Sequence, residues 1–236
     1  MCISEKAEVY KIINGALKTT IKVFCIVFVF SMAFAYIESA VVVYLRAIFY
    51  PDGFDFPITL FDLSPLGKRL LLTEIGREVA TLVLIFTGSW LFGKNRRQRF
   101  AYFMIIFAVW DIFYYVWLKV LLDWPASIMD WDVLFLIPTT WASAVLYPVL
   151  ISITLLVFAA VILYRDAHGR TIKVTQIDWL VFVISGIIVV VSFCTPGPHV
   201  TKPDYESYFY WPLFAAGLAL AVGMFIKCLI KSKSQH

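Results

Sequence analysis

Long apolar segments separated by short polar ones run through the whole chain. Each apolar segment covers roughly 20 residues, which is the length that an α-helix needs to cross about 30 Å of hydrocarbon. None of them alternates between apolar and polar positions, as the strands of a transmembrane barrel do. The pattern therefore predicts six membrane-spanning helices, at about residues 22–46, 70–93, 100–121, 140–164, 178–195 and 209–227.

Composition favours the same class of protein. Hydrophobic residues make up 61% of the 236 residues, charged residues make up only 15%, and the mean hydropathy is +0.85. A soluble domain of this length would expose too much apolar surface to water. We therefore predict a single all-α domain over residues 1–236, a polytopic transmembrane helical bundle with the lipid bilayer as its surroundings.

The basic residues indicate which side of the membrane each connection faces. Fourteen of the 20 lysines and arginines lie in four segments, namely residues 1–22, 94–99, 165–173 and 227–233. Because basic segments stay in the cytoplasm, we expect both termini to be cytoplasmic in a multi-pass protein of the cell (inner) membrane. These segments lack aromatic platforms between their charges, so the net charge of +4 does not indicate nucleic-acid binding.

The N-terminal leader, residues 1–21, is charged and amphipathic and has no signal-peptide shape. Its apolar residues fall at helical spacing, which predicts a helix lying on the inner leaflet before the chain turns into the bilayer. A disordered basic leader is the alternative interpretation. The apolar residues of this face are Val9, Ile12, Ile13, Ala16 and Leu17.

Two outer connections carry signals of local structure. Ser64 and Pro65 have the residue types of a helix cap and a first helical position, so we expect the second helix to begin there. In the second outer connection, apolar residues are spaced four, three and four apart. This spacing predicts a short interfacial helix at 125–137, which would cover the outer face as a lid. The spaced residues are Trp124, Ile128, Trp131 and Phe135.

Charged residues within the predicted spans are the main functional signal. A charge in hydrocarbon costs several kcal/mol unless it is paired or hydrated, so such residues normally face the interior of the bundle. At 1.5 Å per residue, Glu38 lies roughly 24 Å above the inner boundary and Asp111 roughly 16 Å above it. We predict an outward-facing polar site in the first three spans, with substrate- or ion-binding candidates Glu38, Arg46, Glu74, Arg77, Glu78, Asp111, Tyr115, Lys119 and Asp132.

The same charged residues have a structural interpretation. Within the spans, four acids face three bases, so an ion-pair network that fixes the helices together would nearly balance its charges. Asp111, Tyr115 and Lys119 share one helical face, but Asp111 lies more than a turn from Lys119. A structural network and a functional site therefore both remain open.

Cofactor chemistry is constrained by the residue types present. The three histidines lie in loops or in the tail, so haem and histidine-ligated zinc within the bilayer are excluded. Carboxylates are the ligands that Mg²⁺, Ca²⁺ or Mn²⁺ accept, although the neighbouring Arg77 would oppose a cation. We expect no cofactor and leave a divalent cation open, with the candidate ligands Glu38, Glu74, Glu78 and Asp111.

Three strings in the first two thirds of the chain are distinctive: AYIESAVVVYLR at 35–46, REVATLVLIF at 77–86 and WDIFYYVWLK from 110. With them, the chain resembles a group of uncharacterised prokaryotic six-span integral membrane proteins. The resemblance implies no activity. It implies only that certain polar residues belong to a shared pattern, namely Glu38, Arg46, Arg77, Glu78, Asp111, Lys119 and Asp132.

Three classes of function fit these observations. The leading hypothesis is the binding or translocation of a small cation or proton-coupled solute, with Asp111 as the deep titrating group. The first alternative is an enzyme that acts on a lipid at the outer leaflet through a carboxylate or metal site. The second is an accessory subunit of a larger membrane complex or homo-oligomer, since Ala215, Ala219 and Gly223 would permit close helix contact.

Overall fold

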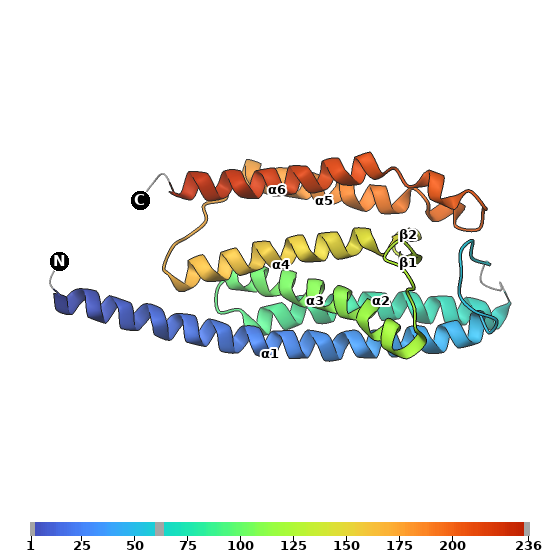
Figure 1. The fold of residues 1–236 in the computed structure, drawn as a ribbon, viewed down its shortest axis with the longest axis horizontal. Coiled ribbons are helices and arrows are strands. Elements are labelled where there is room, and N and C mark those ends of the chain that lie inside the picture. Colours follow the sequence, from blue (N-terminus) through green and yellow to red (C-terminus); the bar gives the residue numbers. More distant parts are fainter. Residues whose placement is uncertain (1–2, 60–63, 234–236) are drawn as a thin grey trace.

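The computed structural model describes residues 3–59 and 64–233, and it is a bundle of long helices with one short β-hairpin (Figure 1). Both termini lie at one end of the bundle, the terminal end, and the hairpin lies toward the other, the hairpin end (Figure 1). The elements are α1 (Ile3–Phe49), α2 (Pro65–Phe92), α3 (Arg96–Leu122), β1 (Trp131–Phe135), β2 (Trp141–Ala144), α4 (Leu146–Ala167), α5 (Gln176–Cys194), two 3₁₀ turns (Gly197–His199 and Tyr205–Tyr208) and α6 (Trp211–Lys233).

Membrane-spanning character is present in most of these helices. In α2, five charges lie between Lys68 and Glu78, which sets it apart from the helices that qualify as spans by length and composition. The other long helices agree with the multi-pass membrane protein predicted from the sequence. Among the residues described, five helices are long and apolar enough to cross a membrane: Asn14–Phe49, Arg96–Leu122, Leu146–Ala167, Gln176–His199 and Trp211–Ser232.

The predicted starts of the first two helices have different outcomes. The predicted turn between the N-terminal leader and the first span is wrong, because α1 continues as one helix through residues 3–49. Leader and span have no proline between them, so nothing interrupts the backbone hydrogen bonds of the helix. Residues 1 and 2 lie outside the described residues, as do the side chains of residues 3–13. The predicted start of α2 is confirmed, because the Ser64 hydroxyl accepts a hydrogen bond from the Gly67 N–H and Pro65 is the first helical residue.

The predicted interfacial helix at 125–137 is wrong. Part of this segment forms β1, which pairs in antiparallel fashion with β2, so the bundle is not purely α-helical. Trp131, Val133 and Phe135 occupy alternate positions and are aromatic or β-branched, which suits a strand. Pro138 lacks the N–H that a continuing helix or strand would require. The helical spacing noted in the sequence was therefore coincidental, and the fourth span begins only after β2.

The hairpin is held by close contacts with the connection after α5. A Cβ atom on Gly197 would lie 2.0 Å from the Thr140 carbonyl oxygen, so only glycine allows this approach. Trp131 and Ala144 of the hairpin share a buried apolar cluster with Phe193 and Phe209. This cluster joins the hairpin to the α5–α6 pair.

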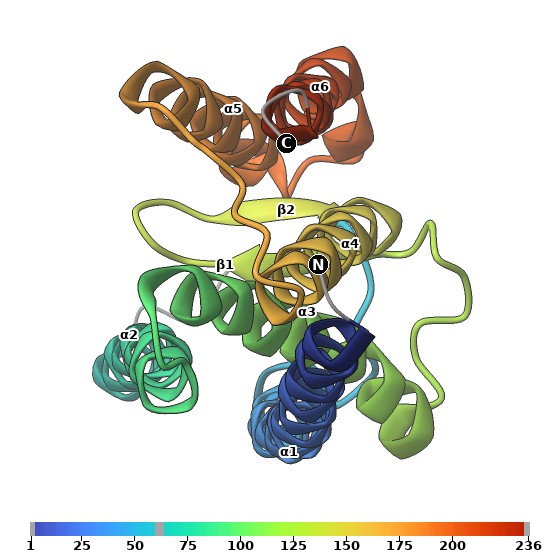
Figure 2. The ribbon, with the colours of Figure 1, turned by 90° about the vertical axis from the view of Figure 1, so that its left-hand side faces the viewer.

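The helices form two groups. Figure 2 shows α1 and α2 standing apart below α3, with α4 next to α3, whereas α5 and α6 form a separate pair above them. A second apolar cluster fills the space among α1, α2, α3 and α4 toward the terminal end. Its fully buried residues include Val27, Ile85 and Ile105. The packed core therefore lies between the termini and the polar residues that the sequence predicted as a site.

Candidate binding site at the hairpin end of the bundle

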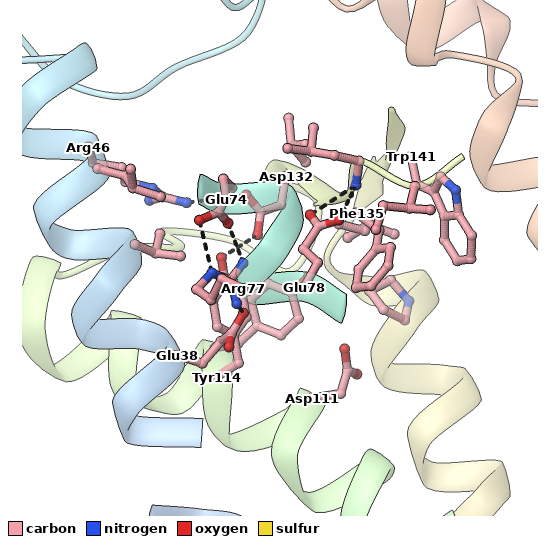
Figure 3. Close-up of a pocket in the computed structure, with 18 of the residues that line it drawn as sticks. Glu38, Arg46, Glu74, Arg77, Glu78, Asp111, Tyr114, Asp132, Phe135 and Trp141 are labelled. Atoms are coloured by element: carbon pink, nitrogen blue, oxygen red, sulfur yellow. Dashed lines mark hydrogen bonds and ion pairs between the residues drawn. The ribbon is translucent and has the colours of Figure 1, made fainter. Parts of the chain in front are cut away.

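A cavity of about 340 Å³ lies between α1, α2, α3 and the β-hairpin, and its far wall reaches α4 and α5. Most of its wall is apolar or aromatic, and one polar group of side chains lines it (Figure 3). Eight of the nine candidates predicted from the sequence line this cavity. They are Glu38, Arg46, Glu74, Arg77, Glu78, Asp111, Tyr115 and Asp132.

Arg77 of α2 lies at the centre of one ion-pair group. Its guanidinium group donates to the carboxylates of Glu38 on α1 and Glu74 on its own helix (Figure 3). The second oxygen of Glu38 accepts a hydrogen bond from the Thr81 hydroxyl at 3.2 Å. The carboxylates of Glu38 and Glu74 are 8% and 13% exposed, so both depend on Arg77 for their balancing charge. This group joins α1 to α2 across the mouth of the cavity.

Arg46 of α1 forms a second ion pair, with Asp132 of β1. The guanidinium Nη2 lies 3.2 Å from Asp132 Oδ1, and the Tyr114 hydroxyl donates to the other carboxylate oxygen at 3.2 Å. The Arg46 guanidinium also stacks between the rings of Phe54 and Trp124, 3.9 and 3.8 Å from their centres. Burial raises the pKa of the Asp132 carboxyl, whereas Arg46 and Tyr114 act in the opposite direction. The hairpin is thereby fixed to α1 and α3.

Glu78 ties the hairpin to α2. Both of its carboxylate oxygens accept from the Leu136 backbone N–H, at 3.0 Å. Leu136 directly follows β1. The pairing of β1 with β2 is irregular between Val133 and Phe135, and Leu136 is not paired with a residue of β2. Glu78 is buried and has no ion pair among the residues described. Its negative charge therefore interacts with a backbone dipole and, without a direct ion pair, with the nearby Arg77.

Asp111 of α3 lines the cavity and contacts α4. Its Oδ2 accepts from the Ser152 hydroxyl of α4 at 2.7 Å, and within the described part of the chain it forms no ion pair. Figure 3 shows Asp111 apart from the groups around Arg77 and Arg46. The indole N–H groups of Trp110 and Trp141, which also line the cavity, are buried without a hydrogen-bond partner. The Asp111 carboxyl thus lines the cavity without an ion pair, whereas the two indole nitrogens lie beneath the surface of the cavity wall.

Lys119, the ninth candidate, was wrongly placed in the site. Its ammonium group pairs with Asp123 at 2.8 Å, and both side chains are largely exposed, at 49% and 92%. Two helical turns separate Lys119 from Asp111 along α3, and Lys119 lies near the end of the helix, where its side chain reaches the C-terminal carbonyl of Asp123. Asp111 therefore lacks the counter-ion that the structural interpretation, a network of ion pairs, required for it.

The metal hypothesis has little geometric support. Two of the four candidate ligands, Glu38 and Glu74, are bound to Arg77, and Glu78 is bound to the Leu136 N–H. In residues 3–59 and 64–233, no three Asp, Glu, His or Cys side chains are arranged to hold a metal ion. The described carboxylates are therefore distributed among protein partners rather than around one point.

Sequence reasoning missed residues that line the cavity and residues that contact its wall. Ser152, which contacts Asp111, had no signal beyond being a lone serine in an apolar span, and pairing the two required knowledge of how α3 and α4 pack. Trp141, which lines the cavity, had been placed at the start of a span, and Trp124, which stacks on Arg46, had been counted with the predicted interfacial helix. The residues that complete the site are thus mainly aromatic, and their pattern alone does not distinguish a cavity wall from a membrane interface.

The chain was compared with protein-family models, curated proteins and solved structures, and nothing matched. The resemblance to a group of six-span membrane proteins therefore stays a prediction. Function is inferred from the cavity itself.

Proposed function

We propose that this protein binds an organic cation with an apolar part in the cavity at the hairpin end. The supporting feature is a charge imbalance on the wall. Among the described residues, five carboxylates line the cavity, but only the two guanidinium groups of Arg46 and Arg77 oppose them. In a poorly hydrated space, excess negative charge requires either a proton or a positively charged guest. A cationic ligand supplies that charge.

Asp111 carries the proposal. Each guanidinium group is already bound to carboxylates, whereas the Asp111 carboxyl has only the Ser152 hydroxyl as a partner among the described side chains. A neutral hydroxyl provides one hydrogen bond and no balancing charge. The positively charged group of the ligand therefore binds at Asp111.

The remaining wall suits an organic cation better than a bare metal ion. A volume of about 340 Å³ lies within the range of small-molecule sites. Phe107, Trp110 and Tyr115 come from the same helix as Asp111, and aromatic faces attract organic cations. Apolar residues along α1 and α2 cover the hydrocarbon part of the ligand.

The site faces the outside of the cell in the proposed orientation. With α2 as a sixth span, both termini are cytoplasmic and the hairpin end is extracytoplasmic, which follows the distribution of basic residues. The membrane is then the cytoplasmic (inner) membrane. Toward the terminal end, the first four helices are packed by apolar residues, which favours binding over translocation.

The test uses three probes that share one apolar tail: octylammonium, octanol and octanoate. The purified protein is placed in a nonionic maltoside detergent, and the change in its melting temperature with each probe is measured. We expect octylammonium to raise the melting temperature of the native protein by several degrees and octanoate to have no such effect. In Asp111→Asn, which keeps the shape but removes the charge, the effect of octylammonium should disappear.

Asp123→Asn is the matched control, because it neutralises an exposed carboxyl that does not line the cavity. This variant should respond to octylammonium as the native protein does. Equal stabilisation by octylammonium and octanoate, or an unchanged response in Asp111→Asn, would contradict the proposal.

A second candidate function is chemistry on a lipid. The observation that favours it is that Leu82 of α2 lines the cavity and is 43% exposed, so part of the cavity wall can be reached from outside the bundle. Asp111 would then act as an acid or base. Conversion of labelled membrane lipids by the purified protein, lost in Asp111→Asn, would favour this candidate over simple binding.

A further inference from the structure

A second cavity, of about 510 Å³, lies between the two helix groups and is independent of the proposed cation site. Its walls come from α3 and α4 on one side and from α5 and α6 on the other. Nearly all of the lining is apolar, with Leu155, Phe158 and Phe182 as typical residues. The cavity is therefore an apolar groove between two groups of membrane helices.

One end of this groove is basic. Arg96 and Arg97, the first residues of α3, line it there. Arg97 is bound to Asp166 at 2.9 Å, whereas Arg96 is exposed and forms no ion pair within the described part of the chain. Trp179 of α5 lies beside them and packs edge to face on Phe100 at 5.1 Å. Arginine and tryptophan at one end of an apolar groove are typical of the headgroup level of a membrane.

We propose that this groove binds a phospholipid of the cytoplasmic leaflet, with an acyl chain between the helix groups and an anionic headgroup at Arg96. The basic end of the groove is complementary to a phosphate diester that carries net negative charge. The end of the groove also lies at the cytoplasmic side in the proposed orientation, where anionic lipids provide this headgroup. A zwitterionic lipid has the same acyl chains but lacks the net charge.

The middle of the groove is suited to an acyl chain. Gly186 of α5 lines it, and a Cβ atom at this position would have no neighbour within 4 Å. The stacked rings of Phe158 and Phe225, 4.0 Å apart, close the groove between α4 and α6. A large side chain at residue 186 would therefore occupy the space that the acyl chain takes, without displacing the protein backbone.

The experiment is native mass spectrometry of the delipidated protein titrated with phosphatidylglycerol or phosphatidylcholine of identical acyl chains. A basic residue near the membrane surface strengthens binding of an anionic lipid by about fivefold. We therefore expect the first phosphatidylglycerol to bind at least about fivefold more tightly than phosphatidylcholine. In Arg96→Ala this preference should fall to less than about twofold, and Arg96→Lys should retain most of it.

Two further variants separate the groove from general surface charge. Arg170→Ala removes an exposed arginine from the next loop on the same side, and it should keep the full preference. Gly186→Phe should weaken both lipids equally, because it fills the groove and leaves Arg96 in place. Inorganic phosphate should not compete, since it lacks the acyl chain.

Three results would overturn the proposal. They are equal affinity for the two lipids in the native protein, an unchanged preference in Arg96→Ala, and cross-linking of residue 186 to a second copy of the chain instead of to lipid. None of these results depends on the cation site, because the two cavities share only Ile151 in their linings.

Discussion

The charged region formed by α1, α2 and α3 contrasts with the apolar pair α5 and α6. In the first region, helices are joined through buried ion pairs around Arg77 and Arg46, and a cavity remains between them. In the second region, a hydrogen bond from a side chain to the backbone joins the helices: the Ser185 hydroxyl donates to the Gly217 carbonyl oxygen at 2.6 Å. The one ion pair between these helices, of Asp178 with Lys227 in the described part of the chain, lies at the terminal end, where Lys227 is exposed.

The difference shows how one membrane bundle can be both a scaffold and a site. Small residues let two helices approach until no space is left, and such contacts need no charge. Long charged side chains hold helices at a greater distance, and the space between them becomes a cavity whose walls carry unmatched charge. Variants that exchange or remove these two kinds of contact test whether the comparison is correct.

The largest effect is expected from Arg77→Met. This change leaves the buried carboxylates of Glu38 and Glu74 without a cation while keeping a side chain of similar length. Loss of one partner from a buried ion pair costs about 3 kcal/mol or more. The free energy of unfolding in mixed micelles should fall by this amount.

Lys119→Met provides the control for Arg77→Met. It also removes a cation from an ion pair, but this pair is exposed, so the expected change is below about 1 kcal/mol. Equal losses in the two variants would mean that the Arg77 group does not join α1 to α2 as described.

A smaller effect is expected from Gly217→Leu in the apolar pair. A Cβ atom at this position would lie 2.8 Å from Val189 Cγ2 and 3.2 Å from the Ser185 carbonyl oxygen. Forcing extra atoms into such a contact costs about 2 kcal/mol. Gly223→Leu is the matched control on the same helix, because its Cβ would meet nothing within 4 Å. If both variants unfold at the same denaturant concentration, α5 and α6 are not in close contact at Gly217.

The smallest effect is expected from Thr81→Val, which keeps the shape of the side chain and removes its hydrogen bond to Glu38. One such bond contributes about 1 kcal/mol. Thr73→Val is the control on the same helix, because Thr73 is exposed and its hydroxyl donates only to the backbone carbonyl of Arg69. Thermal unfolding of the two variants side by side measures the difference. If Thr73→Val lowered the stability as much as Thr81→Val does, the result would contradict a stabilising hydrogen bond from Thr81 to Glu38.

The sequence predicted those features that depend on local pattern. Apolar length placed α2 to α6 to within six residues at either end, although α1 begins far before the predicted span. Ser64 with Pro65 predicted the start of α2 because capping is a local interaction. Counting residues along the predicted spans also grouped Glu38, Glu78 and Asp111 together, and these three residues line one cavity.

The sequence could not predict features that depend on packing between distant segments. The β-hairpin was mistaken for a helix because its apolar residues fit both spacings, and only pairing with β2 distinguishes the two. Lys119 lies on the helix face of Asp111 by spacing, yet its long side chain reaches Asp123 instead. Ser152 and Asp111 are 41 positions apart, so their hydrogen bond is a product of the α3–α4 contact alone.

The central claim is that the unpaired Asp111 carboxyl binds the positive group of a ligand, and a structure with a heavy-atom probe tests it most directly. The protein is crystallised with 8-bromooctylammonium, and the bromine is located from its anomalous scattering. We predict bromine density along the apolar wall between α1 and α2, with the ammonium group at the Asp111 carboxylate. Bromine density outside the cavity, or an ammonium group placed at Glu74 instead of Asp111, would contradict the claim.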